Sequence, residues 1–259
     1  MLVDQTTAFS MTLDDPSFGW VHGILSQFQF RFDNINDESK KFPCVFAQNA
    51  YKRSNIKFLF IPFDQEQKQY RYDIMLQGID RYLKDALQWD QDVNTAEPLL
   101  TIFEPINTIH STSDYQAVFS QSLQYLIDHD THDWVGGIPQ DPSKDFWTMC
   151  FGGTQIFINV SHPNNRNRLS RNLCGALVLV INPRERFDVV AGSNKKGHLI
   201  REQIRKNIDG YDLIPRSPYL GHYQDGELEW PQYMLPDDNE SMPMACPLHF
   251  PAFKRQHTR

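Results

Sequence analysis

The feature that most constrains the fold is an alternation of short apolar runs with longer amphipathic segments. Residues 56–62 and 99–103 are apolar runs of strand length. Each precedes a segment, 72–89 and 115–127, in which apolar residues recur every three or four positions. That spacing is typical of one face of an α-helix. The resulting strand–helix–strand–helix order favours a sheet that is covered by helices.

A further helix is predicted before these elements, over residues 17–39. Its apolar residues are spaced at four positions, at Trp20, Ile24, Phe28 and Phe32. We expect this helix to end before Phe42-Pro43-Cys44, because proline disfavours the helical conformation in the residue that precedes it.

The second half of the chain has the pattern of a strand cluster. Strands are predicted over residues 146–151, 155–160 and 177–181. The first two are joined by Gly152-Gly153, a tight-turn signal, and the third is stopped by Asn182-Pro183. A helix is expected over 194–208, and the Pro-, Tyr- and Gly-rich segment after Gly210 should be ordered coil. The sequence therefore predicts an α/β fold, with α+β as the alternative: one domain over residues 1–259, with a mixed sheet of about five strands flanked by helices.

Composition narrows the classes of function. The net charge of −7 argues against a nucleic-acid binder that neutralises phosphates, and it is compatible with a cationic substrate. Four cysteines without CxxC spacing indicate a reducing compartment. Residues 1–15 lack the features of a signal peptide, and the longest apolar run, 176–181, is too short to span a bilayer. We expect a cytoplasmic protein with no membrane or nucleic-acid partner.

The segment over residues 161–172 is the most suggestive for chemistry. It directly follows a predicted strand, so His162 leaves the sheet at its edge, and Arg166, Arg168 and Arg171 follow it. A haem needs an axial ligand such as imidazole, and arginine is the preferred partner for carboxylates such as the two propionates. The alternative is a surface loop with solvated arginines and a hydrogen-bonded histidine.

A second candidate is the cluster of His129, His132 and Asp133. Two histidines and a carboxylate form the facial triad of non-haem iron sites. The alternative is structural, because histidine near a helix C-terminus is favoured by the helix dipole.

Two cysteines and two arginines complete the candidates. Cys44 and Cys246 are each next to a proline; a thiolate could ligate haem iron or act as a redox thiol, or the residue could be a small buried hydrophobe. Arg201 and Arg205 are four positions apart and share a helix face, where they could clamp a propionate or pair with Glu202.

No GxSxG, HExxH, P-loop or GxGxxG motif is present, so hydrolase and nucleotide-binding functions lack their usual signals.

Many short motifs, in order and spacing, resemble the YqcI/YcgG family over residues 18–250. They are Phe42-Pro43-Cys44 with Ala47 and Ala50, Phe151-Gly152-Gly153, the loop 162–172, Leu179-Val180-Ile181-Asn182-Pro183-Arg184, Ile200-Arg201 with Ile204-Arg205, Leu220-Gly221-His222-Tyr223, Glu229-Trp230-Pro231-Gln232-Tyr233 and Cys246-Pro247. In an oxygenase-like branch of the family a His-Pro pair follows the strand, as His162-Pro163 does here. In another branch a histidine stands three positions later, where this chain has Asn165.

The resemblance implies a haem-dependent N-oxygenase that hydroxylates a nitrogen of an arginine-like guanidine or amine. It implies haem b with His162 as the iron ligand. From the residues themselves we expect the propionates at Arg168 and Arg171, with Arg201 or Arg205 as a helper, and Cys44 as the second candidate ligand. Electrons would come from an external reductase, since nothing here resembles a flavin or iron–sulfur domain. A carboxylate should hold the cationic substrate. The alternatives are a non-catalytic haem or small-ligand binder and a non-haem iron enzyme, and we leave open whether the chain forms a homodimer.

Overall fold

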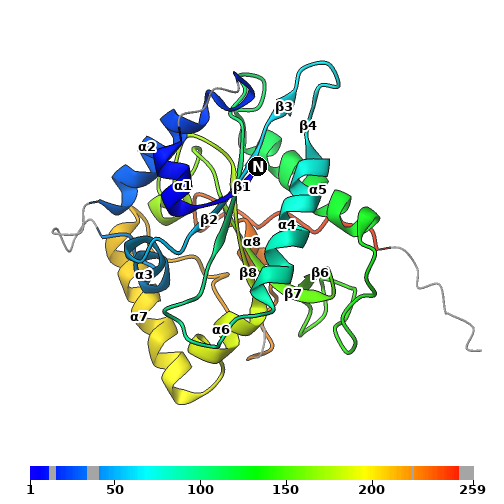
Figure 1. The fold of residues 1–259 in the computed structure, drawn as a ribbon. Coiled ribbons are helices and arrows are strands. Elements are labelled where there is room, and N and C mark those ends of the chain that lie inside the picture. Colours follow the sequence, from blue (N-terminus) through cyan, green and yellow to red (C-terminus); the bar gives the residue numbers. More distant parts are fainter. Residues whose placement is uncertain (12–15, 34–40, 223–224, 251–259) are drawn as a thin grey trace, which may run out of the picture.

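A mixed six-stranded sheet with the strand order β1-β2-β5-β8-β7-β6 forms the centre of the computed structural model, which describes residues 1–11, 16–33, 41–222 and 225–250 (Figure 1). Its strands are β1 (Leu2–Asp4), β2 (Lys57–Ile61), β5 (Leu99–Phe103), β8 (Val178–Pro183), β7 (Thr154–Ser161) and β6 (Met149–Phe151). Only β2 and β5 are parallel; all other neighbours are antiparallel. A separate two-stranded ribbon joins β3 (Phe63–Asp64) to β4 (Gln69–Tyr70).

Helices cover both faces of the sheet, because successive side chains of its central strands point to opposite sides. In β2, Leu59 and Ile61 pack under α4 (Tyr72–Ala86) and α5 (Thr112–His129). Phe58 and Phe60 pack on the other face. That face is covered by α1 (Gln5–Ser10), α2 (Val21–Phe32) and α3 (Val45–Lys52). Figure 1 shows these two groups of helices on opposite sides of the sheet. We call the two layers of buried side chains the α4–α5 core and the α2–α3 core.

The remaining helices follow the last central strand. They are α6 (Arg184–Ala191), α7 (Lys195–Tyr211) and the short α8 (Trp230–Tyr233). Two 3₁₀ turns lie earlier in the chain, at Pro16–Phe18 and Leu169–Arg171. The described residues 212–222 and 225–250 are otherwise irregular, as expected for the segment after Gly210.

The prediction of an α/β fold is confirmed, and the strand over residues 99–103 has the predicted bounds. The sheet has one strand more than expected, β1, which pairs with the edge of β2. Gly152 and Gly153 form the predicted turn between β6 and β7, with φ values of 60° and 69°; both central residues of a type I′ hairpin turn require such values.

Four helices that we did not predict are observed, α1, α3, α6 and α8, and two of them, α3 and α6, begin next to a proline. Pro43 precedes Cys44, the N-cap of α3, and Pro183 is itself the N-cap of α6. We interpreted these prolines as stops, whereas proline is also compatible with the start of a helix. The helix expected over 17–39 is observed as α2, and residues 34–40 lie outside the described residues, as does Tyr223.

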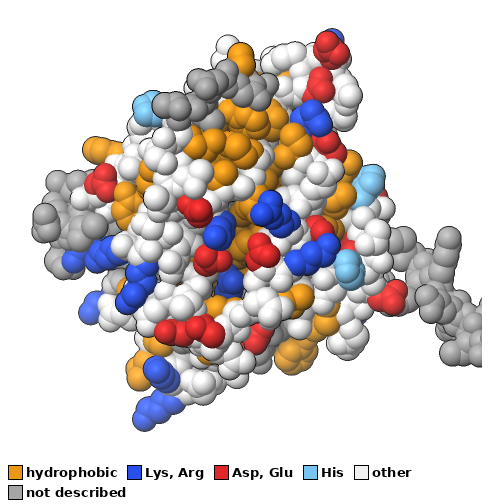
Figure 2. Space-filling model, viewed as in Figure 1, with side chains coloured by type: hydrophobic (Ala, Val, Ile, Leu, Met, Phe, Trp, Pro, Cys, Tyr) orange, Lys and Arg blue, Asp and Glu red, His pale blue; other side chains and the backbone are white. Residues whose placement is uncertain are grey.

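Within the described ranges, no helix combines the length and the apolarity that crossing a bilayer requires. On the face shown in Figure 2, positive and negative side chains are interspersed rather than gathered into a basic patch.

Candidate functional site

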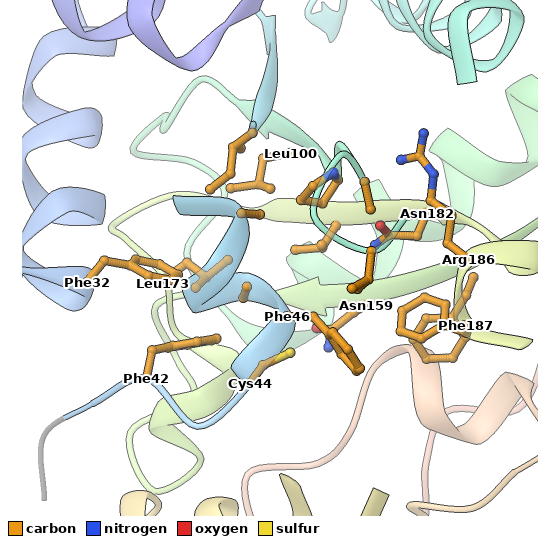
Figure 3. Close-up of a pocket in the computed structure, with 18 of the residues that line it drawn as sticks. Phe32, Phe42, Cys44, Phe46, Leu100, Asn159, Leu173, Asn182, Arg186 and Phe187 are labelled. Carbon is orange, nitrogen blue, oxygen red and sulfur yellow. The ribbon is translucent and has the colours of Figure 1, made fainter. Parts of the chain in front are cut away.

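A cavity of about 190 Å³ lies between α3, the strands β7 and β8, and the start of α6 (Figure 3). Its wall is mainly apolar and includes seven aromatic residues from segments far apart in the sequence: Phe28, Phe32, Phe42, Phe46, Trp89, Phe157 and Phe187. Few polar side chains interrupt this wall: Cys44, Asn159, Ser170, Asn182 and Arg186. A mainly apolar pocket with a small number of polar groups is the usual form of a small-molecule site.

Cys44 is the N-cap residue of α3 and lines this cavity. Cys44 is the only described lining residue whose side chain can ligate haem iron, because the described wall contains no His, Met or Tyr. Burial raises the pKa of the Cys44 thiol, so the thiol is protonated at neutral pH. Coordination to a metal ion reverses this preference, because a coordinating thiol is deprotonated.

Arg186 is the only charged side chain in the described wall of the cavity. It is 6% exposed. Its Nη1 donates to the hydroxyl of Tyr82, at 3.0 Å, and to the carbonyl of Glu97. Its guanidinium carbon lies 5.8 Å from the ring centroid of Tyr82 and 5.7 Å from that of Trp89. The Nε–H group, in contrast, has no hydrogen-bond partner among the described residues.

Asn159 and Asn182 supply polar groups from the sheet itself. They lie on the neighbouring strands β7 and β8, on the side that faces α3. Neither side-chain amide is hydrogen-bonded to another described residue, and asparagine is depleted in strands. The described wall contains no Asp or Glu, so the carboxylate that we expected to hold a substrate cation is not part of it.

His162 lies on the opposite side of the sheet. Its ring stacks on Tyr115 of α5, with the centroids 5.1 Å apart, and the side chain is 2% exposed. Burial lowers its pKa to about 4, an effect that Asp237 partly offsets. Its Nδ1 atom has no hydrogen-bond partner among the described residues. His162 and Cys44, the two predicted iron ligands, are therefore not brought together, and only Cys44 lines the aromatic cavity.

Arg168 and Arg171 fasten their loop to the C-terminal segment. Arg171 is buried, and its Nη1 and Nη2 donate to the carbonyls of Tyr233 and Gln232, at 3.1 and 3.2 Å. Arg168 is also buried and donates to the carbonyls of Pro215, Pro236 and Asp238 and to the Asn239 side chain. The alternative of a solvated surface loop is therefore wrong for these two arginines. Their predicted role at propionates would require them to exchange these backbone partners.

Arg201 and Arg205 do not line the cavity. Arg201 donates to the carbonyls of Ala191 and Gly192 and pairs with Asp225 at 3.2 Å. Arg205 pairs with Glu202 at 2.7 Å, which is the alternative that the sequence allowed.

The cluster of His129, His132 and Asp133 does not form a metal site. His129 stacks on Tyr125 and is hydrogen-bonded to its carbonyl at 2.8 Å, and His132 pairs with Asp130 at 3.3 Å. In the part of the chain that the structure describes, no three His, Cys, Asp or Glu side chains are grouped as a metal would need. The non-haem iron alternative thus loses its proposed ligands.

Sequence reasoning missed Arg186, Asn159 and Asn182. The sequence does contain a signal for the two asparagines. Alternation along each strand places Asn159 on the same face as Phe157 and Asn182 on the same face as Val180, where an apolar residue would be expected. Arg186 gives no such signal, since its partners Tyr82 and Glu97 are remote in the sequence.

Comparison with known proteins identifies relatives but no structural match. The model of the YqcI/YcgG family matches residues 32–249. "Putative N(omega)-hydroxy-L-arginine synthase DcsA" of Streptomyces lavendulae is 39% identical over 210 residues, which are 81% of this chain and 78% of that protein. The uncharacterized proteins YqcI and YcgG of Bacillus subtilis (strain 168) are 29% and 27% identical, over 88% and 86% of this chain and 87% of each relative. No solved structure matches. The chain therefore belongs to the YqcI/YcgG family.

Proposed function

We propose that this protein is a haem-dependent N-hydroxylase of a small arginine-like guanidine or amine, and that the aromatic cavity is its active site. The observation that supports this site is that one cavity combines an iron-ligating residue, Cys44, with a buried cation, Arg186, that has an unused donor. The Streptomyces lavendulae relative, by its name, supplies the reaction.

The chain's own residues fit the proposed cofactor by their chemistry. Cys44 would ligate the iron, and the buried Arg186, whose guanidinium is held by Tyr82 and Glu97, is the one cation of the described wall (Figure 3). The aromatic wall suits a planar macrocycle. The enclosed volume exceeds the roughly 150 Å³ that holds a benzene ring but is below the 300 Å³ or more typical of larger ligands, so a macrocycle would extend through the open side of the cavity.

The polar side chains that the sheet contributes to the cavity would position the substrate. The side-chain oxygens of Asn159 and Asn182 would accept hydrogen bonds from its N–H groups, and the apolar wall would exclude water. Haem, when bound, would supply the activation of dioxygen. The electrons would come from an external reductase.

The first prediction concerns the iron ligand. Cys44→Ser should abolish or shift the Soret band of haem-loaded protein, because it removes the only iron-ligating side chain of the described wall. Cys246→Ser is the matched control, since Cys246 is also next to a proline but does not line the cavity. Absorption spectra of both variants and of His162→Ala check this; a Soret band altered only in His162→Ala would return the ligand to His162.

The second prediction concerns turnover. With a chemical reductant or a reductase and dioxygen, haem-loaded protein should convert L-arginine or a related guanidine into a product heavier by one oxygen atom. Mass spectrometry over a panel of amino acids, guanidines and polyamines measures this. Asn159→Leu should reduce the yield, because it removes an acceptor without changing the charge. A protein that holds haem but oxygenates nothing in the panel would be a haem carrier or sensor.

A further inference from the structure

Asn159 and Asn182 form a pair of neighbouring amides on one face of the sheet. In the antiparallel register of β7 and β8, Asn182 is opposite Phe157 and Asn159 is opposite Val180. All four side chains line the cavity, so the two amides are diagonal neighbours on adjacent strands (Figure 3). Residues in this relation are roughly 7–8 Å apart, which lets one small ligand reach both side chains.

The two amides are left for a ligand or for water. Both residues are half-buried, and neither side chain makes a hydrogen bond to another described residue. Polar groups that are removed from bulk solvent are ordinarily hydrogen-bonded. Each side-chain amide carries an N–H donor and a carbonyl acceptor, so the pair can complement a ligand edge that carries both kinds of group.

The described wall offers no counter-charge to a ligand that binds this pair. It contains no Asp, Glu, Lys or His, and burial raises the pKa of the Cys44 thiol, which keeps it neutral. Arg186 is the one cation, and its Nη1 is bound to Tyr82 and Glu97. An ion that is enclosed without a counter-charge loses its hydration without compensation, which costs far more than enclosing a neutral polar group.

The size of the cavity limits the enclosed group. Its volume of about 190 Å³ exceeds the roughly 150 Å³ of a cavity that holds benzene. It therefore accommodates one ring, or a chain of similar size, with a short polar substituent. Aromatic side chains in the wall are suited to a planar group.

We infer that the group that enters the cavity is small, planar and uncharged, and that Asn159 and Asn182 select it by binding its donor and acceptor atoms. This assignment rests on the proposed function, in that it takes the cavity as the substrate site. It adds that a nitrogen base enters in its unprotonated form, in which the nitrogen lone pair is available. Among substrates of similar shape, the less basic nitrogen compound is then bound more tightly.

Three probes of nearly identical shape test the preference for an uncharged group. At neutral pH benzamide is neutral, benzamidine is a cation and benzoate is an anion. Each is titrated into haem-free wild-type protein, with calorimetry as the readout of binding. We expect benzamide to bind at least about tenfold more tightly than either ion, because only the ions are enclosed without a counter-charge.

Substitutions of the two asparagines test their role. Asn182→Asp supplies the missing counter-charge and should reverse the order, so that benzamidine binds more tightly than benzamide. Asn159→Leu should weaken benzamide roughly tenfold, whereas toluene, which forms no hydrogen bond, should bind as before. Asn107→Leu is the control, since Asn107 is exposed and does not line the cavity. If Asn182→Asp does not fold, Asn159→Asp makes the same test from the neighbouring strand.

Two results overturn the assignment and leave the proposed function intact. One is wild-type protein that binds benzamidine or benzoate as tightly as benzamide, and the other is an unchanged affinity for benzamide in folded Asn159→Leu. Wild-type protein that binds neither the three probes nor toluene overturns the cavity as a ligand site, and with it the active site of the proposed function.

Discussion

The His162 side chain illustrates how burial determines the charge of a single residue. Its imidazole is enclosed between the end of β7 and Tyr115, and burial lowers its pKa to about 4. The ring is therefore neutral in the folded protein at neutral pH. In the unfolded chain the same group has a pKa of about 6.5.

The third prediction follows from this difference. Between pH 6.5 and pH 4 the unfolded chain binds a proton that the folded protein excludes, so the free energy of unfolding falls as the pH is lowered. At pH 5 the loss is about 2 kcal/mol relative to neutral pH. His162→Phe keeps a ring against Tyr115 but does not titrate, so its urea unfolding should lose about 2 kcal/mol less than wild type between pH 7 and pH 5. The exposed His110 provides the control, since His110→Phe should retain the wild-type pH dependence. An equal pH dependence in His162→Phe and wild type would contradict a neutral buried His162.

At the scale of the element, the loop over residues 162–172 braces the C-terminal segment. The carboxylate of Asp237 accepts hydrogen bonds from the backbone amides of Arg166, Asn167 and Arg168. Arg171 caps the last carbonyls of α8, which a helix leaves without partners of its own. The loop thus holds the C-terminal segment in place in two ways. A side chain of the loop binds backbone carbonyls of the segment, and a side chain of the segment binds backbone amides of the loop.

The fourth prediction separates this role from cofactor binding. Arg171→Met leaves two buried carbonyls without donors, so the free energy of unfolding of haem-free protein should fall by roughly 2–3 kcal/mol. Arg166→Met, in the same loop but exposed, should change it by less than about 0.5 kcal/mol. Denaturant unfolding measures both. Lower haem affinity in Arg171→Met with unchanged unfolding would instead support the predicted role at a propionate.

Periodicity was sufficient to predict the elements with a strong apolar pattern, such as β5, α4 and α5. It failed for α3 and α6, because their starts depend on how the chain leaves Pro43 and Pro183 in three dimensions. The same holds for the site. Cys44 could be found from the sequence, whereas the contacts of Arg186 are made by residues near positions 82, 89 and 97 that only the fold brings to it.

At the scale of the whole molecule, the sheet separates the two predicted ligands. Cys44 lies with the aromatic cavity on the side of the α2–α3 core, and His162 packs with the α4–α5 core. The substitutions of Cys44 and His162 therefore test different faces of the sheet. A ligand bound at one face leaves the other face covered by its own helices (Figure 1).

Because the chain is synthesised from its N-terminus, the residues that cover the two faces of the sheet become available at different times. Every described residue of the cavity wall has been synthesised once Phe187 has been added, and the α2–α3 core requires nothing beyond Tyr211. The α4–α5 core still lacks Trp230, Tyr233 and Leu248 at that point, and Arg171 lacks its carbonyl partners. A nascent chain therefore contains every described residue of its cavity wall before the α4–α5 core has received its last side chains.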